Sequence, residues 1–216
     1  MKNFENRHRE KFLRILSKEL HEFDQPNILE FGVSDKALST SIFLEICEKK
    51  DGKLYSIDVI NYNYHFNSNK WFFLNCRDDD YELIEKKIPP LFDIIYLDTI
   101  HTAKHVKKIL YYYFNKLKVG GVFVIDDTSL LPYLKNREKN NFSLEINNNE
   151  TFEMLIEVCN SNPHTIYLEA SFIGTGAVKL TKLTEDELKF NKVLNSRKFS
   201  LLNFVRKIYL FFRKKL

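Results

Sequence analysis

Carboxylates and one histidine stand at the ends of two short apolar runs in this sequence. The first run ends at Asp98, with His101 three residues later, and the second ends in Asp126 and Asp127. Carboxylates are ligands that hard divalent ions prefer, and a histidine can exchange a proton near neutral pH. If the fold gathers these side chains, we expect a metal-assisted proton transfer.

The elements that must position them are predicted from the apolar runs themselves. Residues 93–97 and 121–125 are almost wholly apolar and are preceded by Pro89-Pro90 and Gly120-Gly121. Such runs are typical of strands buried on both faces of a parallel sheet. Ligands bind beyond the carboxyl ends of the strands in these sheets, which is where the acids and the histidine stand.

The rest of the chain alternates predicted strands and helices, which indicates an α/β fold. We predict a Rossmann-like, seven-stranded, mostly parallel sheet with an antiparallel C-terminal hairpin strand and helices on both faces. The strands are expected at 27–31, 53–57, 71–74, 93–97, 121–125, 165–171 and 177–181. The helices are expected at about 4–23, 39–49, 81–87, 105–116 and 152–158, and a long polar loop at 134–150.

Three segments follow from this pattern. Residues 1–24 form an N-terminal helix packed on the core, residues 25–183 form the main domain, and residues 184–216 form a basic amphipathic helical extension.

The first half of the main domain resembles a nucleotide-binding arrangement. Gly32 follows the first strand and permits close backbone approach, and Ser39-Thr40 can cap the next helix. Asp58 ends the second strand, a position suited to the two ribose hydroxyls. Asp78, Asp79 and Asp80 follow the third strand, where an acid could meet an adenine amino group or the run could cap the next helix. The loop that contains Gly32 has only one glycine and lacks the pattern G-x-G-x-x-G. It is therefore a poor candidate for a pyrophosphate-binding loop.

Taken together, these segments resemble a class I S-adenosylmethionine-dependent methyltransferase over roughly residues 25–182. The stretch E-F-G-V-S-D-K-A-L-S-T resembles the first motif of that family, with Ala37 at the position of the second glycine. The resemblance implies S-adenosylmethionine as cofactor. It also implies that Glu30, Gly32, Ser39, Thr40, Asp58, Asp78 and Asp79 bind this cofactor.

The later motifs narrow the resemblance to metal-dependent O-methyltransferases of the catechol and macrocin type. By this resemblance Asp98, Asp126 and Asp127 hold Mg²⁺ or a similar ion, and Asp98 and His101 are catalytic, with His101 as general base. Many relatives have D-G-x-H-x-Y after the fourth strand, so Thr99 and Ala103 depart from the pattern. His105 and His164 are interpreted as ordinary surface residues.

Charge is divided unevenly along the chain. The net charge is +4, but from Lys189 onward there are nine Lys or Arg and no acid, which leaves −5 for the first 188 residues. Residues 196–216 mix bulky apolar and basic side chains. They either contact a membrane surface or pack on the domain or on a second subunit, as in a homodimer. Nucleic acid is disfavoured as a partner because no RNA-binding motif accompanies the charge.

The expected location is the cytoplasm, peripheral at the inner face of a membrane if the tail binds lipid. Residues 1–11 lack the apolar core of a signal peptide, and Cys47, Cys76 and Cys159 lack metal-site spacing. We expect the methyl acceptor to be a hydroxyl of a small polar molecule such as a sugar or glycan. Two alternatives stay open: an NAD-dependent oxidoreductase, and a non-catalytic peripheral membrane or assembly protein with a vestigial cofactor fold.

Overall fold

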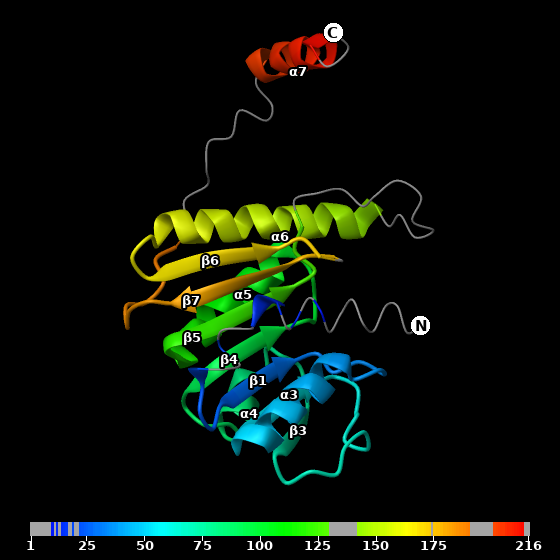
Figure 1. Ribbon diagram of the computed structural model, residues 1–216, viewed down its shortest axis with the longest axis vertical. Coiled ribbons are helices and arrows are strands. Elements are labelled where there is room, and N and C mark those ends of the chain that lie inside the picture. The colour runs from blue at the N-terminus through cyan, green and yellow to red at the C-terminus, as the bar shows by residue number, and fades with distance from the viewer. Residues whose placement is uncertain are drawn as a thin grey trace.

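A seven-stranded sheet forms the centre of the computed structural model (Figure 1). The structure describes residues 10, 12, 14–16, 19, 22–129, 142–173, 175–190 and 201–213. The strand order is β3-β2-β1-β4-β5-β7-β6. The strands are β1 (Asn27–Phe31), β2 (Lys53–Asp58), β3 (Trp71–Asn75), β4 (Phe92–Leu97), β5 (Leu117–Asp126), β6 (Ile166–Ser171) and β7 (Ala177–Lys182).

Strands β1 to β5 pair in parallel, and β7 is antiparallel to both β5 and β6. The predicted Rossmann-like sheet with its antiparallel C-terminal hairpin strand is therefore confirmed. Strand β1 pairs with β2 on one side and with β4 on the other. The chain reverses its direction of winding at this point, which places a crevice beyond the ends of β1 and β4.

Helices cover both faces because the central strands alternate their side chains between two apolar cores. In β4, Ile95 and Leu97 pack on one face, whereas Ile94 and Tyr96 pack on the other. The first face is covered by α4 (Tyr81–Glu85), α5 (Ala103–Tyr113), η1 (Phe114–Lys116) and α6 (Phe142–Ser161). The second face is covered by α3 (Leu38–Lys50) and by the N-terminal residues Phe12, Ile15 and Leu16.

The N-terminal residues are tied to the sheet by a buried ion pair as well. Lys179 Nζ of β7 lies 2.8 Å from Glu19 Oε1, and both side chains are about 5% exposed. Phe12, Ile15 and Leu16 are buried in the core of the sheet, and the division of the chain into three segments stays a prediction.

The predicted loop at 134–150 is wrong for its second part, because α6 begins at Phe142. Residues 134–141 of that prediction lie outside the described residues. The buried stripe of α6 starts with Asn148 and Thr151 before it continues with Phe152, Leu155 and Val158. The spacing is helical, but its first two members are polar, so hydropathy along the sequence did not reveal the first half of the helix.

The segment predicted as a basic helical extension contains one described helix, α7 (Leu201–Arg213). Residues 184–190 have no helical structure, and 191–200 lie outside the described residues. Among the described residues, no helix is both long and apolar enough to cross a membrane.

Candidate active site

The ends of β1 and β4 touch each other through their backbones. Asp98 N donates a hydrogen bond to the carbonyl of Phe31 at 2.9 Å, and on the other side of β1 Gly32 N donates to the carbonyl of Ile57 in β2 at 2.9 Å. Gly32 has φ +96°, and a Cβ built on it would overlap the carbonyl oxygen of Asp98. Only glycine fits this close approach, so the predicted role of Gly32 as a point of backbone proximity has a structural basis.

A cleft of about 240 Å³ opens at this crossing. Three of the residues predicted for cofactor binding line it: Gly32, Asp58 and Asp78. Asp98 and Thr99 line it from the β4 side. The other lining residues, which the sequence did not single out for binding, are Ile57, Val59, Cys76, Arg77 and Ile100.

Asp58 fixes the loop that follows β1. Its Oδ2 accepts a hydrogen bond from Val33 N at 2.8 Å, and its Oδ1 accepts one from Ile60 N at 2.9 Å. The carboxylate therefore holds the two loops of the cleft in register while it lines the cleft itself.

Glu30, Ser39 and Thr40 lie beneath the cleft and do not line it. Ser39 and Thr40 are buried inside α3 and do not cap it, because the N-cap is Ala37, without a side-chain cap bond. Ala37 has φ 44°, the left-handed conformation that suits the glycine it replaces in the motif. The predicted role of Glu30, Ser39 and Thr40 in cofactor binding stays a prediction.

Glu30 is completely buried, and Ser56 Oγ donates to its Oε2 at 2.7 Å. Burial raises the pKa of Glu30 to about 7, against the opposing effect of the hydroxyls of Ser39 and Ser56. The carboxyl is thus protonated more readily in the folded protein than in the unfolded chain.

This shift predicts how stability depends on pH. Between pH 4.5 and about 7 the folded protein binds more protons at Glu30 than the unfolded chain does, so rising pH lowers the free energy of unfolding. Glu30→Gln, which cannot ionise, is expected to remove this slope. From pH 5 to pH 8, the free energy of unfolding of the wild type should fall by about 2 kcal/mol relative to that of Glu30→Gln. Urea unfolding at the two pH values measures this. A difference that is independent of pH would contradict the shift.

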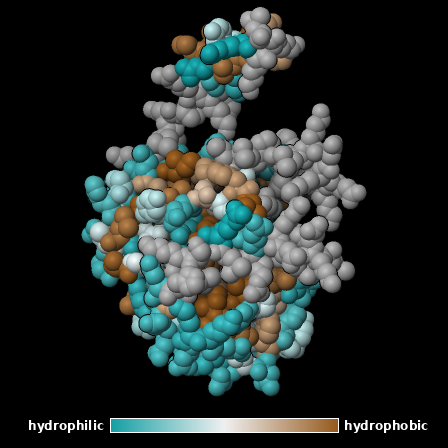
Figure 2. All heavy atoms as spheres, in the orientation of Figure 1, coloured by the Kyte–Doolittle hydropathy of each residue, from teal (hydrophilic) through white to brown (hydrophobic). Residues whose placement is uncertain are grey.

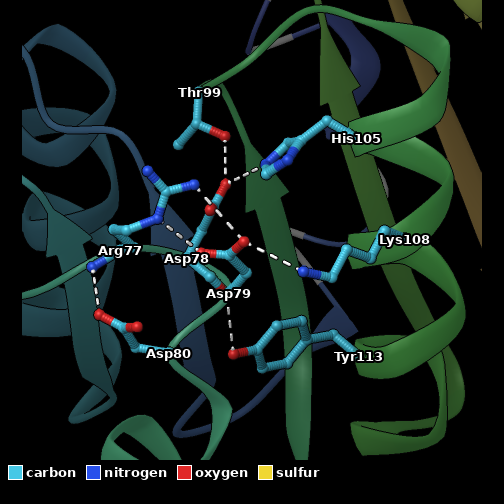
Figure 3. Close-up of polar contacts among 8 residues, drawn as sticks. All are labelled: Arg77, Asp78, Asp79, Asp80, Thr99, His105, Lys108 and Tyr113. Carbon is cyan, nitrogen blue, oxygen red and sulfur yellow. Dashed lines mark hydrogen bonds and ion pairs between the residues drawn. The ribbon is translucent and has the colours of Figure 1, made fainter.

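At the far end of the cleft, Asp78 is held from two elements (Figure 3). Its Oδ2 accepts a hydrogen bond from Thr99 Oγ1 at 2.5 Å and lies 2.7 Å from His105 Nε2. The backbone carbonyl of Asp78 accepts a hydrogen bond from Tyr113 Oη at 3.2 Å. The interpretation of His105 as an ordinary surface residue is wrong: its side chain is 11% exposed and fixes this carboxylate.

Asp79 is paired with two cations and does not line the cleft. Arg77 Nε lies 2.8 Å and Lys108 Nζ 3.0 Å from its carboxylate oxygens (Figure 3). These two partners hold the pKa of Asp79 well below its usual range. Of the run Asp78–Asp80, Asp80 occupies the N-cap of α4, without a side-chain cap bond.

The side chains of Asp98, His101 and Asp127 gather at the ends of β4 and β5. His101 Nε2 lies 3.4 Å from Asp98 Oδ1 and 3.6 Å from Asp127 Oδ2. One ligand atom from each of the three lies within 4.8 Å of the others, and each side chain is between one fifth and one third exposed. His101 does not cap α5, since Thr102 is the N-cap.

Asp126 lies below this cluster. It is 3% exposed, accepts a hydrogen bond from Tyr96 Oη at 2.7 Å, and accepts another from Asp127 N at 2.7 Å. The Tyr96 hydroxyl also lies 3.2 Å from Asp98 Oδ2, so it bridges the two carboxylates. Burial, together with the charges of Asp126 and Asp98, raises the pKa of Tyr96 well above its usual value. The Tyr96 hydroxyl therefore stays protonated and acts as a hydrogen-bond donor.

Comparison with known proteins identifies the fold. No family model and no curated protein matches this sequence. Among solved structures, the MycE methyltransferase of the mycinamycin biosynthetic pathway, in complex with Mg, SAH and mycinamycin VI, matches with a TM-score of 0.56 and 19% identity over 84% of this chain. A putative caffeoyl-CoA O-methyltransferase from Staphylococcus aureus matches at 0.53 and 18% identity, over 79% of each chain. The chain has a methyltransferase fold.

A third structure agrees with this methyltransferase fold. The SAH-bound methyltransferase PaMTH1 of Podospora anserina matches with a TM-score of 0.55 and 11% identity, over 74% of this chain and 72% of that one. The present chain spans about half the length of MycE, of which it covers 50%.

Within the methyltransferase fold, sequence reasoning missed two polar residues of the site. Tyr96 stands inside an apolar run and therefore looked like an ordinary strand residue. His105 lies four residues after His101, inside α5, and only the packing of α5 against the loop after β3 brings it to Asp78. Thr99, which departs from the pattern D-G-x-H-x-Y, contacts the same carboxylate.

Proposed function

We propose that this protein is an S-adenosylmethionine-dependent O-methyltransferase. The observation that carries the proposal is the cleft at the β1/β4 crossing, with acids from β2 and the loop after β3 on one side and the Asp98–His101–Asp127 cluster on the other. The neighbours of the same fold that bind SAH, and in MycE also Mg, support it.

The donor half of the site consists of Gly32, Asp58 and Asp78. Gly32 leaves room for the methionine part of the donor, Asp58 accepts hydrogen bonds from the ribose hydroxyls, and Asp78 accepts one from the adenine amino group. Glu30, Ser39 and Thr40 support the loop from below, and Asp79 holds Arg77 and Lys108 beside the adenine end.

The residues at the strand ends fit a hard divalent ion such as Mg²⁺. Two carboxylates and an imidazole have ligand atoms within 4.8 Å of one another, and carboxylate oxygen is the donor that Mg²⁺ prefers. Asp98 and Asp127 would hold the ion. Asp126 stays the predicted third ligand, since a carboxylate oxygen that accepts one hydrogen bond has a second lone pair. A bound ion would lower the pKa of the acceptor hydroxyl and orient its oxygen.

His101 is the proposed general base. It takes the proton of the acceptor hydroxyl as the oxygen forms a bond to the methyl carbon and the bond from that carbon to sulfur breaks. The products are the methyl ether, S-adenosylhomocysteine and a protonated His101. Asp98 and Asp127, whose carboxylate oxygens lie 3.4 and 3.6 Å from His101 Nε2, keep the ring in place.

The proposed acceptor is a hydroxyl of a small polar molecule such as a sugar, and the complex of MycE with mycinamycin VI supports a small-molecule acceptor. We place the reaction in the cytoplasm, and the three free cysteines Cys47, Cys76 and Cys159 fit a reducing compartment.

Calorimetry with the full chain tests the donor. S-adenosylmethionine and S-adenosylhomocysteine are each expected to bind in equimolar ratio, and NAD⁺ is expected not to bind. Asp58→Ala should weaken binding at least about tenfold, because it removes hydrogen bonds to a charged acceptor. Asp35→Ala, which replaces an exposed acid in the loop after β1, is the matched control and should leave the affinity unchanged. Absence of heat with both sulfur compounds would overturn the proposal, and binding of NAD⁺ would favour the oxidoreductase.

A further inference from the structure

Helix α7 exposes a continuous apolar stripe. Leu201, Phe204, Val205, Ile208 and Phe212 follow one another at the spacing that places side chains on one face of a helix, and each is between 43% and 81% exposed. No described residue of α7 is buried, and Figure 2 shows apolar and hydrophilic residues of this helix at the surface. A stripe of this size is more apolar surface than ordinary solvent-facing helices carry.

The opposite side of the same helix is basic. Arg206, Lys207 and Arg213 lie on it, and the sequence adds Arg197 and Lys198 before the helix and Lys214 and Lys215 after it. No acid occurs from residue 189 to 216, whereas residues 1–188 carry a net charge of −5. The positive charge is therefore concentrated beside the apolar stripe.

We propose that α7 binds the surface of a lipid bilayer that contains anionic lipids. The stripe inserts among the acyl chains at the interface, and the Arg and Lys side chains contact the negatively charged headgroups. Thirteen residues make a helix of about 20 Å, which is too short for the ~30 Å hydrocarbon core, so the helix lies in the plane of the surface.

Charge complementarity favours this occupant over a second copy of the same helix. Two α7 helices packed stripe to stripe would cover the apolar residues but leave the basic side of each helix facing outward, with no acid in residues 189–216 to offset its charge. An anionic bilayer covers the stripe and neutralises the charge at once. This surface is independent of the cleft, so the proposal does not depend on methyl transfer.

Co-sedimentation of the full chain with vesicles tests the proposal. We expect binding to phosphatidylcholine vesicles that contain phosphatidylglycerol, and much weaker binding to phosphatidylcholine alone. The double variant Arg206→Gln/Lys207→Gln should bind about 25-fold more weakly, at about fivefold for each charge, and high salt should weaken the wild type similarly.

A matched pair of variants tests the orientation of the helix. Ile208 and Leu210 are each 43% exposed, but Ile208 belongs to the stripe and Leu210 lies between Arg206 and Arg213 on the basic side. Ile208→Ser should weaken vesicle binding about tenfold or more, and Leu210→Ser should change it little. Calorimetry with S-adenosylmethionine should be the same for both variants and the wild type, which separates loss of the surface from loss of the fold.

Three results would overturn the proposal. One is binding that is equal for neutral and anionic vesicles, and another is equal effects of Ile208→Ser and Leu210→Ser. The third is the absence of vesicle binding. In that case, concentration-dependent dimers abolished by Ile208→Ser would assign the stripe to a second copy, and hydrogen-exchange protection of 201–213 in the monomer would assign it to the chain's own domain.

Discussion

Asp127→Asn is expected to weaken divalent-ion binding at least about 100-fold, because it removes a charged ligand from the proposed ion site. Asn is the appropriate replacement because Asp127 has φ 52°, a left-handed conformation that Asn adopts at least as readily. The backbone at the end of β5 should therefore keep its shape. Titration with Mn²⁺ followed by electron paramagnetic resonance measures the affinity without any knowledge of the methyl acceptor.

The second acid–histidine cluster provides the control. Asp78, Asp79 and His105 also have ligand atoms within 4.8 Å of one another, but Asp79 is already paired with Arg77 and Lys108. Asp79→Asn is expected to leave Mn²⁺ binding unchanged. If Asp79→Asn abolished binding and Asp127→Asn did not, the ion site would belong to the other cluster. Calorimetry with S-adenosylhomocysteine should show unchanged donor binding in Asp127→Asn.

Gly32→Ala is expected to destabilise the protein by about 3 kcal/mol or more and to abolish donor binding. Two costs add: φ +96° is unfavourable for any residue with a Cβ, and that Cβ would overlap the carbonyl oxygen of Asp98. Relief of the overlap must push the end of β1 away from the end of β4, which displaces both halves of the site together. Urea unfolding and calorimetry with S-adenosylmethionine measure the two effects.

Gly120→Ala is the control that distinguishes the effect of steric overlap from the effect of backbone strain in Gly32→Ala. Gly120 has φ +83°, close to that of Gly32, but nothing lies within 4 Å of a Cβ built on it. This variant should lose only about 1 kcal/mol and bind the donor normally. Equal losses in the two variants would show that strain alone matters, and that the contact between Gly32 and Asp98 does not hold the site together.

Tyr96 and Gly32 show how the two halves of the site depend on each other. Gly32 sits against the backbone of Asp98 on the side of the proposed donor site, and the Tyr96 hydroxyl joins Asp98 to Asp126 on the side of the proposed acceptor site. Asp98 is therefore fixed from both directions before any ligand binds. Such prior positioning is what a methyl transfer between two bound molecules requires.

The sequence by itself determined the sheet and the positions of the strand-end acids. Strands such as β4 are recognisable because burial on both faces leaves an uninterrupted apolar run, and Asp98, Asp126 and Asp127 stand where those runs stop. Both features depend only on neighbouring residues, so local pattern was sufficient.

Only the tertiary structure decided which of these groups meet. His101, and not Asp126, completes the close cluster with Asp98 and Asp127, because Asp126 points into the core toward Tyr96. His105 reaches Asp78 across 27 positions of sequence, and the start of α6 is a helix because Asn148 and Thr151 continue a buried stripe. These facts depend on strand order and on which side chains lose contact with water. Both arise from contacts between distant segments, which no pattern of neighbouring residues contains.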